Sequence, residues 1–287
     1  MQRITTIAAI VGATYGLLLL LERLLPLRRP SRPLLGRLAV NVATSALAIG
    51  TAAVLVRPTA EFMLNWTGNN RFGLLHLGSL PPAIDFILSF LLMDLSFYYW
   101  HRANHGFRLL WRFHNAHHID PDLDVSTGFR FHAGEVIYST GLRVIQVGAI
   151  GLSPWAFAVY ELCFQIATLF EHSNIRLPIR MERVLVRILV TPRMHGIHHS
   201  QIRQETNSNY CTVFTCWDWL HRTLRLDVPQ SEIEIGVPGY SLPEDDELKN
   251  VLFVPLRPQR KYWPESDDSV AASRRAAGAV SRWHLEA

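Results

Sequence analysis

Cysteine and lysine are both scarce in this chain of 287 residues. The three cysteines are Cys163, Cys211 and Cys216, and no two of them form a C-x-x-C pair. A disulfide framework, a zinc ribbon and a four-cysteine iron–sulfur cluster therefore all lack their ligands. Any metal bound here must be held by nitrogen or oxygen atoms.

Charge is also scarce. Charged residues make up 18% of the chain, against about 25% in an ordinary soluble domain. Hydrophobic residues make up 49%, which excludes intrinsic disorder. The mean hydropathy is +0.11 although the chain holds 28 lysines and arginines. The apolar residues must therefore be concentrated in separate segments, as in membrane proteins.

Long hydrophobic runs are present in the first two thirds of the chain. Residues 4–21, 38–56 and 83–100 are each close to the length of about 20 apolar residues that spans a bilayer, and we predict a transmembrane helix in each. Residues 136–170 are apolar but slightly short for two full spans, and Gly151 and Pro154 interrupt them. This pattern predicts a bent helical hairpin.

The arginines predict the orientation in the membrane. Only Arg3 precedes the first predicted helix, whereas five arginines lie between the first two, at positions 23, 28, 29, 32 and 37. The positive-inside rule places this loop in the cytoplasm, where its arginines would meet anionic lipid headgroups. Counting the crossings then places residues 101–132, 172–199 and the C-terminus on the same side. We predict a multi-pass protein of a bacterial inner membrane.

The composition divides the chain into three predicted parts. Residues 1–82 hold the N-terminal transmembrane helices, residues 83–225 form a histidine-rich domain, and residues 226–287 form a cytosolic tail broken up by prolines. No stacking motif or phosphate-binding loop accompanies the basic charge, so we expect no nucleic-acid partner.

Histidine is the residue in excess. Nine of the 13 histidines lie within residues 101–132 and 195–199, where an even distribution would place about two. Eight of them form three boxes: His101-x-x-x-His105, His114-x-x-His117-His118 and His195-x-x-His198-His199. Residues at i, i+3 and i+4 share one face of a helix, so each box directs its imidazoles to one point. The isolated histidines at positions 76, 221 and 284 are predicted to bind no metal.

Eight imidazoles are more than one ion needs. Zinc takes four ligands, whereas two six-coordinate ions with open positions can use all eight, and nitrogen-rich sites of that kind suit non-haem iron. Zinc hydrolases need a glutamate within the box, and zinc deaminases need P-C-x-x-C; neither motif is present. Haem ligation is disfavoured because the boxes lie at predicted helix ends. A non-catalytic membrane metal-binding or transport protein remains an alternative, although its spans would need more ionisable residues.

The segments around the boxes resemble a known family. The motifs His101-Arg-x-x-His105, Leu110-Trp-Arg-Phe-His114-x-x-His117-His118 and Thr191-Pro-x-x-His195-x-x-His198-His199-Ser are similar to those of the fatty acid hydroxylase and sterol desaturase superfamily of membrane di-iron oxygenases. Residues 170–174 and the tail resemble the branch that contains alkylglycerol monooxygenase and bacterial sterol-desaturase-like proteins. The chain departs from its relatives at Asn209-Tyr210-Cys211, which weakens an assignment of substrate by analogy.

The resemblance implies an all-α fold in which a four-helix membrane base carries a cytosolic helical cap. A dinuclear centre of two iron ions would lie between them, and zinc can replace iron in preparations. The implied metal ligands are ten histidines, at positions 101, 105, 114, 117, 118, 132, 172, 195, 198 and 199.

Each metal-bound imidazole needs an acceptor for its other ring nitrogen. We expect this support from Asp94, Glu161, Glu171 and Asn174. Asp94 lies seven residues before His101, on the same helical face, and a charged residue within a membrane span faces a functional interior by default.

The implied activity is hydroxylation of an unactivated C–H bond of a lipid by dioxygen. The lipid would be a fatty acyl, alkyl glycerol or sterol-like molecule, and a desaturase is the alternative within the same superfamily. The sequence contains no flavin, haem or iron–sulfur motif, so the electrons must come from a separate donor. A ferredoxin or a cytochrome b5-type reductase system would serve.

Overall fold

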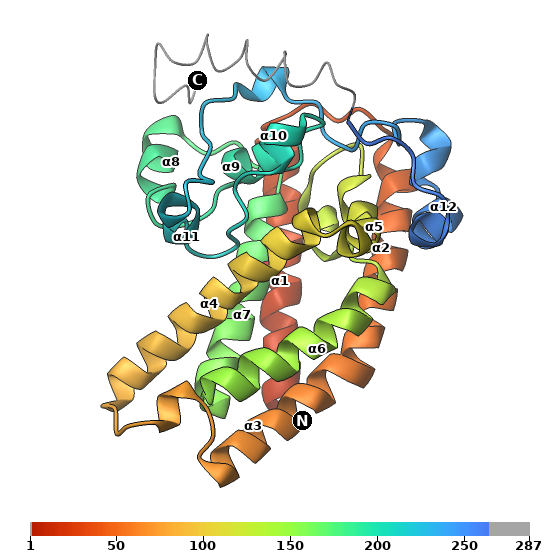
Figure 1. Ribbon diagram of the computed structural model, residues 1–287. Helices are drawn as coiled ribbons and strands as arrows, with labels where there is room; N and C mark the ends of the chain where they lie inside the picture. Colours follow the sequence, from red (N-terminus) through yellow and green to blue (C-terminus); the bar gives the residue numbers. More distant parts are fainter. Residues whose placement is uncertain (1, 264–287) are drawn as a thin grey trace.

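The computed structural model describes residues 2–263. This part of the chain contains helices and turns but no β-strand, which confirms the predicted all-α fold. Long helices form a base, and short helices form a cap at one end of it (Figure 1). His284 and the end of the predicted tail lie outside the described residues.

The base contains five long helical segments rather than the four that the resemblance implies. They are α1 (Gln2–Leu24), α2 (Leu34–Thr51) continued through the π-helical turn η1 (Ala52–Val56) into α3 (Arg57–Asn70), α4 (Pro82–Gly106), α6 (Ala133–Ile150) and α7 (Pro154–His172). Among the described residues, three stretches are long and apolar enough to cross a membrane, and they overlap the three predicted spans: Thr5–Leu24, Leu34–His76 and Pro82–Gly106. Helices α6 and α7 form the predicted hairpin.

The second segment is longer than the sequence suggested. It was expected to end at Val56, but the helix continues as α3 to Asn70. Pro58 lies just after η1 and cannot donate a backbone hydrogen bond to the preceding turn. A π-helical turn is wider than an α-helical turn, and its position before Pro58 lets the helix continue past the proline.

Two glycines bring the far ends of the base together. Gly151 ends α6 with φ 71°, and Gly73, beyond α3, has φ 114°. A Cβ atom on Gly73 would lie 2.5 Å from the Cα of Gly151, so the two backbones touch. Next to this contact, Val147, Met93 and Tyr160 form part of the buried core between α4, α6 and α7.

The cap consists of short helices that follow α4 and α7. They are α5 (Arg108–His118), α8 (Ile179–Leu185), α9 (Pro192–His198), α10 (Arg203–Thr206), α11 (Cys216–Leu220) and α12 (Leu248–Phe253), with 3-10 turns η3 (Val125–Phe129), η4 (Gln230–Glu232), η5 (Pro243–Asp246) and η6 (Val254–Leu256). A further 3-10 turn, η2 (Leu74–His76), lies in the connection between α3 and α4. Buried side chains of Tyr98, Met194 and Tyr210 pack the cap onto α4.

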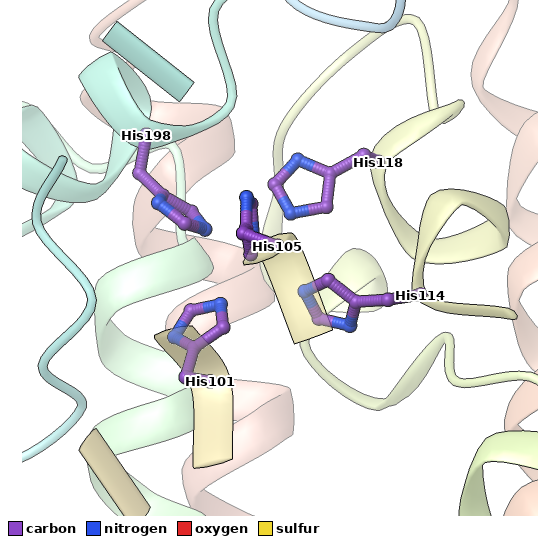
Figure 2. Close-up of side chains that lie close together, drawn as sticks. All are labelled: His101, His105, His114, His118 and His198. Carbon is purple, nitrogen blue, oxygen red and sulfur yellow. The ribbon is translucent and has the colours of Figure 1, made fainter. Parts of the chain in front are cut away.

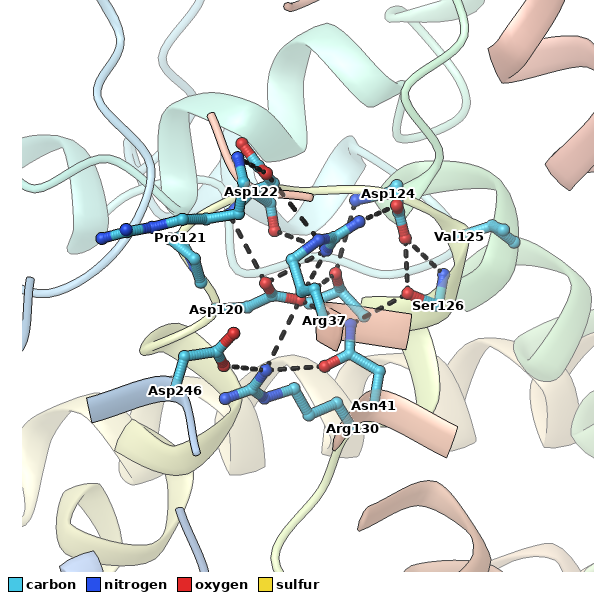
Figure 3. A network of polar contacts seen from close by, with 12 residues as sticks. Arg37, Asn41, Asp120, Pro121, Asp122, Asp124, Val125, Ser126, Arg130 and Asp246 are labelled. Carbon is cyan, nitrogen blue, oxygen red and sulfur yellow. Dashed lines mark hydrogen bonds and ion pairs between the residues drawn. The ribbon is translucent and has the colours of Figure 1, made fainter. Parts of the chain in front are cut away.

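A buried polar network joins α2 to the segment that follows α5 (Figure 3). Arg37 Nη1 lies 3.0 Å from both carboxylate oxygens of Asp120, and Arg37 also pairs with Asp124. Asn41 donates to Asp120 at 2.8 Å. Burial alone would raise the pKa of Asp120, but the nearby Arg37 and Arg130 outweigh it and lower that pKa.

This network corrects one prediction. Five arginines were expected to meet lipid headgroups, but Arg37 is buried and is neutralised inside the protein. Arg23 also forms an ion pair with Asp124, at 3.1 Å. Both carboxylates lie in the segment 120–124, which the sequence pattern did not place beside these arginines.

The same network reaches the C-terminal part of the chain. Arg130 is fully buried, and its Nη1 donates to Asn41 at 2.6 Å and to Asp246 at 2.7 Å. Its Nε donates to the carbonyl of Ala116, within the second histidine box, at 3.1 Å. One guanidinium group thus connects α2, α5 and the tail.

Candidate metal centre

The histidine boxes lie where the long helices meet the cap. The first box occupies the end of α4, the second occupies α5, and the third occupies α9 and the residue after it. His172 is the last residue of α7. The helical spacing predicted for the boxes is confirmed, and four separate helices direct imidazoles into one region.

Nine histidines form two groups. Group A contains His101, His105, His114, His118 and His198, and group B contains His117, His172, His195 and His199. Within each group, one possible ligand atom from every residue lies within 4.8 Å of all the others. Figure 2 shows the five rings of group A pointing toward a common centre from α4, α5 and α9.

The two groups share their helices and touch each other. His117 and His118 are neighbours in sequence but belong to different groups, as are His198 and His199. The rings of His118 and His199 are stacked with centroids 4.2 Å apart. Two ions bound by these groups would therefore be adjacent.

The nitrogen atoms of group B are spaced as ligands of one ion. The Nε2 atom of His172 lies 3.1 Å from that of His117 and 3.0 Å from that of His195. The Nε2 atoms of His195 and His199 are 3.1 Å apart. Two nitrogen ligands at right angles, each about 2.1 Å from an ion, would be about 3.0 Å apart. This spacing fits octahedral better than tetrahedral coordination.

Backbone carbonyls orient three of the rings. His101 Nδ1 donates to the carbonyl of Tyr210 at 2.8 Å, and His198 Nδ1 donates to that of Ser208 at 2.7 Å. His172 Nδ1 donates to the carbonyl of Thr168 at 2.7 Å. Because a carbonyl only accepts, the hydrogen of each neutral ring is on Nδ1, and Nε2 presents a lone pair to its group.

Two carboxylates complete this support. Glu135 on α6 accepts from His114 Nδ1 at 3.0 Å. Glu171 is buried beside group B, 3.6 Å from His195 Nδ1 and 3.7 Å from His172 Nδ1, which is close but beyond hydrogen-bond distance. Glu171 therefore lies where the sequence analysis expected a supporting carboxylate.

The donor set fits metal ions. Buried ring nitrogens with no hydrogen-bond partner include Nε2 of His114, His118 and His198. The lone pairs of ligand atoms that lie within 4.8 Å of one another repel unless a cation lies between them. Burial lowers the pKa of His117, His118, His195 and His199 well below the ordinary value, and lowers that of His198 to about 3. These rings are thus neutral and ready to ligate at neutral pH.

His132 lies apart from both groups, although it was predicted as a tenth ligand. It caps the start of α6, where its Nδ1 accepts from the backbone of Gly134 at 2.9 Å. Its Nε2 donates to the carbonyl of Leu252 at 3.0 Å. Both ring nitrogens are therefore used to hold the backbone.

Three predicted supporting residues also have other partners. Asp94 accepts from the indole of Trp217 at 2.8 Å and from the backbone of Phe214. Glu161 forms an ion pair with Arg143 at 2.8 Å. The side chain of Asn174 bonds to the backbone N–H and carbonyl of Arg28, at 2.9 and 2.8 Å. All three join segments of the protein rather than orienting an imidazole.

The sequence analysis missed Asp218. Its carboxylate accepts from the backbone N–H groups of Tyr210 and Cys211, both at 2.9 Å, and from the Thr223 hydroxyl at 2.7 Å. It thereby fixes the loop whose Tyr210 carbonyl orients His101. The sequence analysis noted in this region only the departure from its relatives at Asn209-Tyr210-Cys211.

A small cavity of about 30 Å³ borders both groups on the side of the base. Aromatic residues of α4 and α7, Phe97, Trp100 and Phe164, line it together with Phe131. His101 and His172 face it from the two groups. Its volume is enough for one or two water-sized molecules, and its walls are largely apolar.

Comparison with known proteins shows that the histidine-rich part of the chain is similar to a known family. Residues 86–223 match the family model described as fatty acid hydroxylase. This confirms the resemblance found in the sequence, and the matched region contains all nine histidines of groups A and B.

Curated relatives support the same superfamily and branch. The ornithine lipid hydroxylase OlsE of Rhizobium tropici is 30% identical over 159 residues, which cover 55% of this chain and 47% of that protein. The human alkylglycerol monooxygenase is 28% identical over 142 residues, or 48% of this chain and 30% of that protein.

The human cholesterol 25-hydroxylase is 26% identical over 139 residues, which cover 47% of this chain and 49% of that protein. The chain thus matches less than half the length of each of these three relatives. No solved structure matches it significantly.

Proposed function

We propose that this protein is a membrane-bound di-iron oxygenase that hydroxylates an unactivated C–H bond of a lipid. Groups A and B would each hold one iron ion, and the electrons would come from a separate donor. The observation that carries this proposal is the pairing of two all-histidine groups, with five and four possible ligands, at the junction of the apolar helices and the cap, where every ligand except the half-buried His105 is buried.

The number and type of ligands favour iron that activates dioxygen. Five or four imidazoles leave one or two positions open on a six-coordinate ion, and nitrogen-rich octahedral sites with open positions suit non-haem iron. Bound iron would supply the activation of dioxygen. One oxygen atom enters the C–H bond and the other leaves as water, which consumes two electrons and two protons.

The chain's own residues would orient and shield this reaction. The carbonyls of Tyr210, Ser208 and Thr168 fix the rings of three ligands. Phe97, Trp100 and Phe164 form an apolar wall beside the groups. This wall suits a hydrocarbon segment and excludes water from the site.

The surroundings of the site and the relatives both support a lipid substrate. Three relatives are named for activity on ornithine lipid, alkylglycerol and cholesterol. The histidines of both groups lie at the ends of α4 and α7 and in or just after α5 and α9. These helix ends are at the cap end of the base, not halfway along it (Figure 1). We therefore propose oxidation of a carbon close to the headgroup, or of a ring methyl group.

Labelled dioxygen tests the activity. Membranes that contain the iron-loaded protein and a chemical or enzymatic reductant are incubated with ¹⁸O₂, and the lipids are analysed by mass spectrometry. We expect one labelled oxygen in a new hydroxyl group, and no product with His118→Ala. An unlabelled product with a new double bond would establish the desaturase instead. Full activity in the metal-free protein would refute an oxygenase.

We also propose that the protein lies in a bacterial inner membrane, with its cap and C-terminus on the cytoplasmic side. Single cysteines placed at Arg108, Ile202 and Asn69 in a cysteine-free variant would report the orientation, because Arg108 is exposed and lies in the segment 101–132. Membrane-impermeant reagents are expected to label only Asn69→Cys from outside. Labelling of positions 108 and 202 from opposite sides would contradict this topology.

A further inference from the structure

A cleft in the protein surface borders group A. It has a volume of about 500 Å³ and is lined by residues from the end of α4, from α10 and from the loop after it. The lining includes Tyr99, Arg102, His105, Phe107, Arg203 and Tyr210. The cleft therefore ends on a proposed metal ligand.

His105 is exceptional among the nine histidines. It is half-buried, whereas the other eight are buried. Its ring lies close to three other members of group A, with centroids 4.6 Å from His198, 4.9 Å from His118 and 5.0 Å from His114. His105 thus borders the cleft while both of its ring nitrogens are buried on the side of group A.

The cleft carries positive charge. Arg102 and Arg203 are exposed, and neither forms an ion pair with another residue of the described chain. No aspartate or glutamate occurs among the described residues that line it. Its surroundings are also basic, because exposed Arg108 follows the lining residue Phe107, and exposed Arg222 follows His221, which bonds to Tyr99. A negatively charged partner would be attracted to this surface.

From these observations we propose that the cleft is the docking site of a small acidic protein that carries single electrons. The inference rests on the proposed function, whose reaction consumes two electrons per hydroxylation. Two carriers in turn would each be oxidised by one electron and would reduce the iron centre. Electron tunnelling becomes exponentially slower with distance, so a carrier seated above His105 would have a short path to group A.

An anionic lipid headgroup is the main alternative occupant. The cleft lies on one face of α4, with Tyr99, Arg102 and Ala103, whereas the cavity beside both groups lies on another face, with Phe97, Trp100 and His101. A lipid in the cleft would thus be separated from that cavity by α4. Electron transfer needs no open path for atoms, so the geometry favours a protein carrier.

Charge reversal tests the docking site. The probe is a small acidic [2Fe–2S] ferredoxin, and its affinity for the full-length, iron-loaded protein in nanodiscs is measured over a series of salt concentrations. We expect affinity to fall with salt, and Arg102→Glu/Arg203→Glu to weaken it at least about tenfold. The charge-preserving variant Arg102→Lys/Arg203→Lys should stay within about twofold of the parent.

A matched control lies elsewhere on the cap. Arg180 and Arg183 are exposed residues of α8, and their replacement by glutamate changes the net charge by the same amount. This control should retain the parent affinity. If both pairs of substitutions weaken ferredoxin binding equally, the effect is due to net charge and the proposed site is wrong. Unchanged ferredoxin affinity of the Arg102→Glu/Arg203→Glu variant would also overturn it.

The rate of iron reduction separates docking from damage to the site. In stopped-flow experiments, ferredoxin should reduce Arg102→Glu/Arg203→Glu at least about tenfold more slowly than the parent, whereas dithionite should reduce both equally. Slower reduction by dithionite as well would overturn the docking role.

Lipid binding tests the alternative occupant, an anionic headgroup. Loss of phosphatidylglycerol binding in the same variant, with ferredoxin binding unchanged, would assign the cleft to a headgroup instead. If dithionite supports no lipid hydroxylation in the parent protein, the proposed function is wrong. The ferredoxin affinity measurements test the docking site separately from that outcome.

Discussion

Glu135 on α6 and His114 on α5 are joined by a hydrogen bond of 3.0 Å between a carboxylate oxygen and Nδ1. Both residues are buried. The contact links a helix of the base to a proposed ligand of group A. It fixes the ring so that Nε2 faces the group.

Removal of this carboxylate should weaken metal binding without abolishing folding. Glu135→Ala is expected to reduce the affinity of one ion by about 10- to 100-fold, as supporting residues of metal sites commonly do. Competition with a chelator, followed by elemental analysis, measures the effect. Glu161→Ala is the control because its partner is Arg143 and not a histidine. Equal metal loss in both variants would contradict the role of Glu135.

The two groups predict selective loss of ions. His118→Ala removes a member of group A, and His199→Ala removes a member of group B. Each variant should retain about one of two ions per chain and lose activity, because metal sites act as units. His132→Ala should retain both ions, since that ring is bonded to the backbone. Elemental analysis gives the counts, and a parent with one ion per chain would refute the dinuclear centre.

Gly151 should tolerate no side chain. A Cβ atom there would lie 2.4 Å from the carbonyl of Phe72, and φ is 71°. Gly151→Ala is therefore expected to destabilise the protein by about 2–5 kcal/mol, from backbone strain and overpacking. Gly141→Ala in the same helix is the matched control, because nothing lies within 4 Å of its Cβ position. The control should raise the thermal midpoint slightly, since alanine favours helix. A similar midpoint for both variants would contradict the close contact.

The metal-free protein should become less stable in acid. Burial lowers the pKa of His198 to about 3 in the folded protein, whereas histidine in an unfolded chain has a pKa of about 6.5. Between these values the unfolded state binds a proton that the folded state does not. The free energy of unfolding must therefore fall as pH decreases through this range, by about 1.4 kcal/mol per pH unit for this residue. Thermal unfolding at a series of pH values measures this slope, and His198→Leu should reduce it.

Sequence spacing predicted the histidine positions well but their supporting contacts poorly. The i, i+3 and i+4 pattern fixes which imidazoles share a helical face, and the boxes are arranged accordingly. The partners of His101, His172 and His198 are backbone carbonyls, which any residue type can supply. No sequence pattern identifies them.

Asp94 is a second residue whose contacts could not be predicted from the sequence. Its helical position relative to His101 was deduced from the sequence, but its partners are Trp217 and Phe214, more than 100 residues away. Periodicity gives the direction of a side chain around its helix axis. It does not give the segment that packs against that face, which depends on the tertiary fold.

The position of Arg130 has a consequence for the exchange of domains between proteins. Its guanidinium is buried within the family-matched region, yet it depends on Asn41 before that region and on Asp246 after it. A chimaera that transfers residues 86–223 alone would bring a buried positive charge without these two partners. A chimaera with a relative would therefore need the segments on both sides of residues 86–223 as well. The part of the chain that must be transferred together is longer than the part that matches the family.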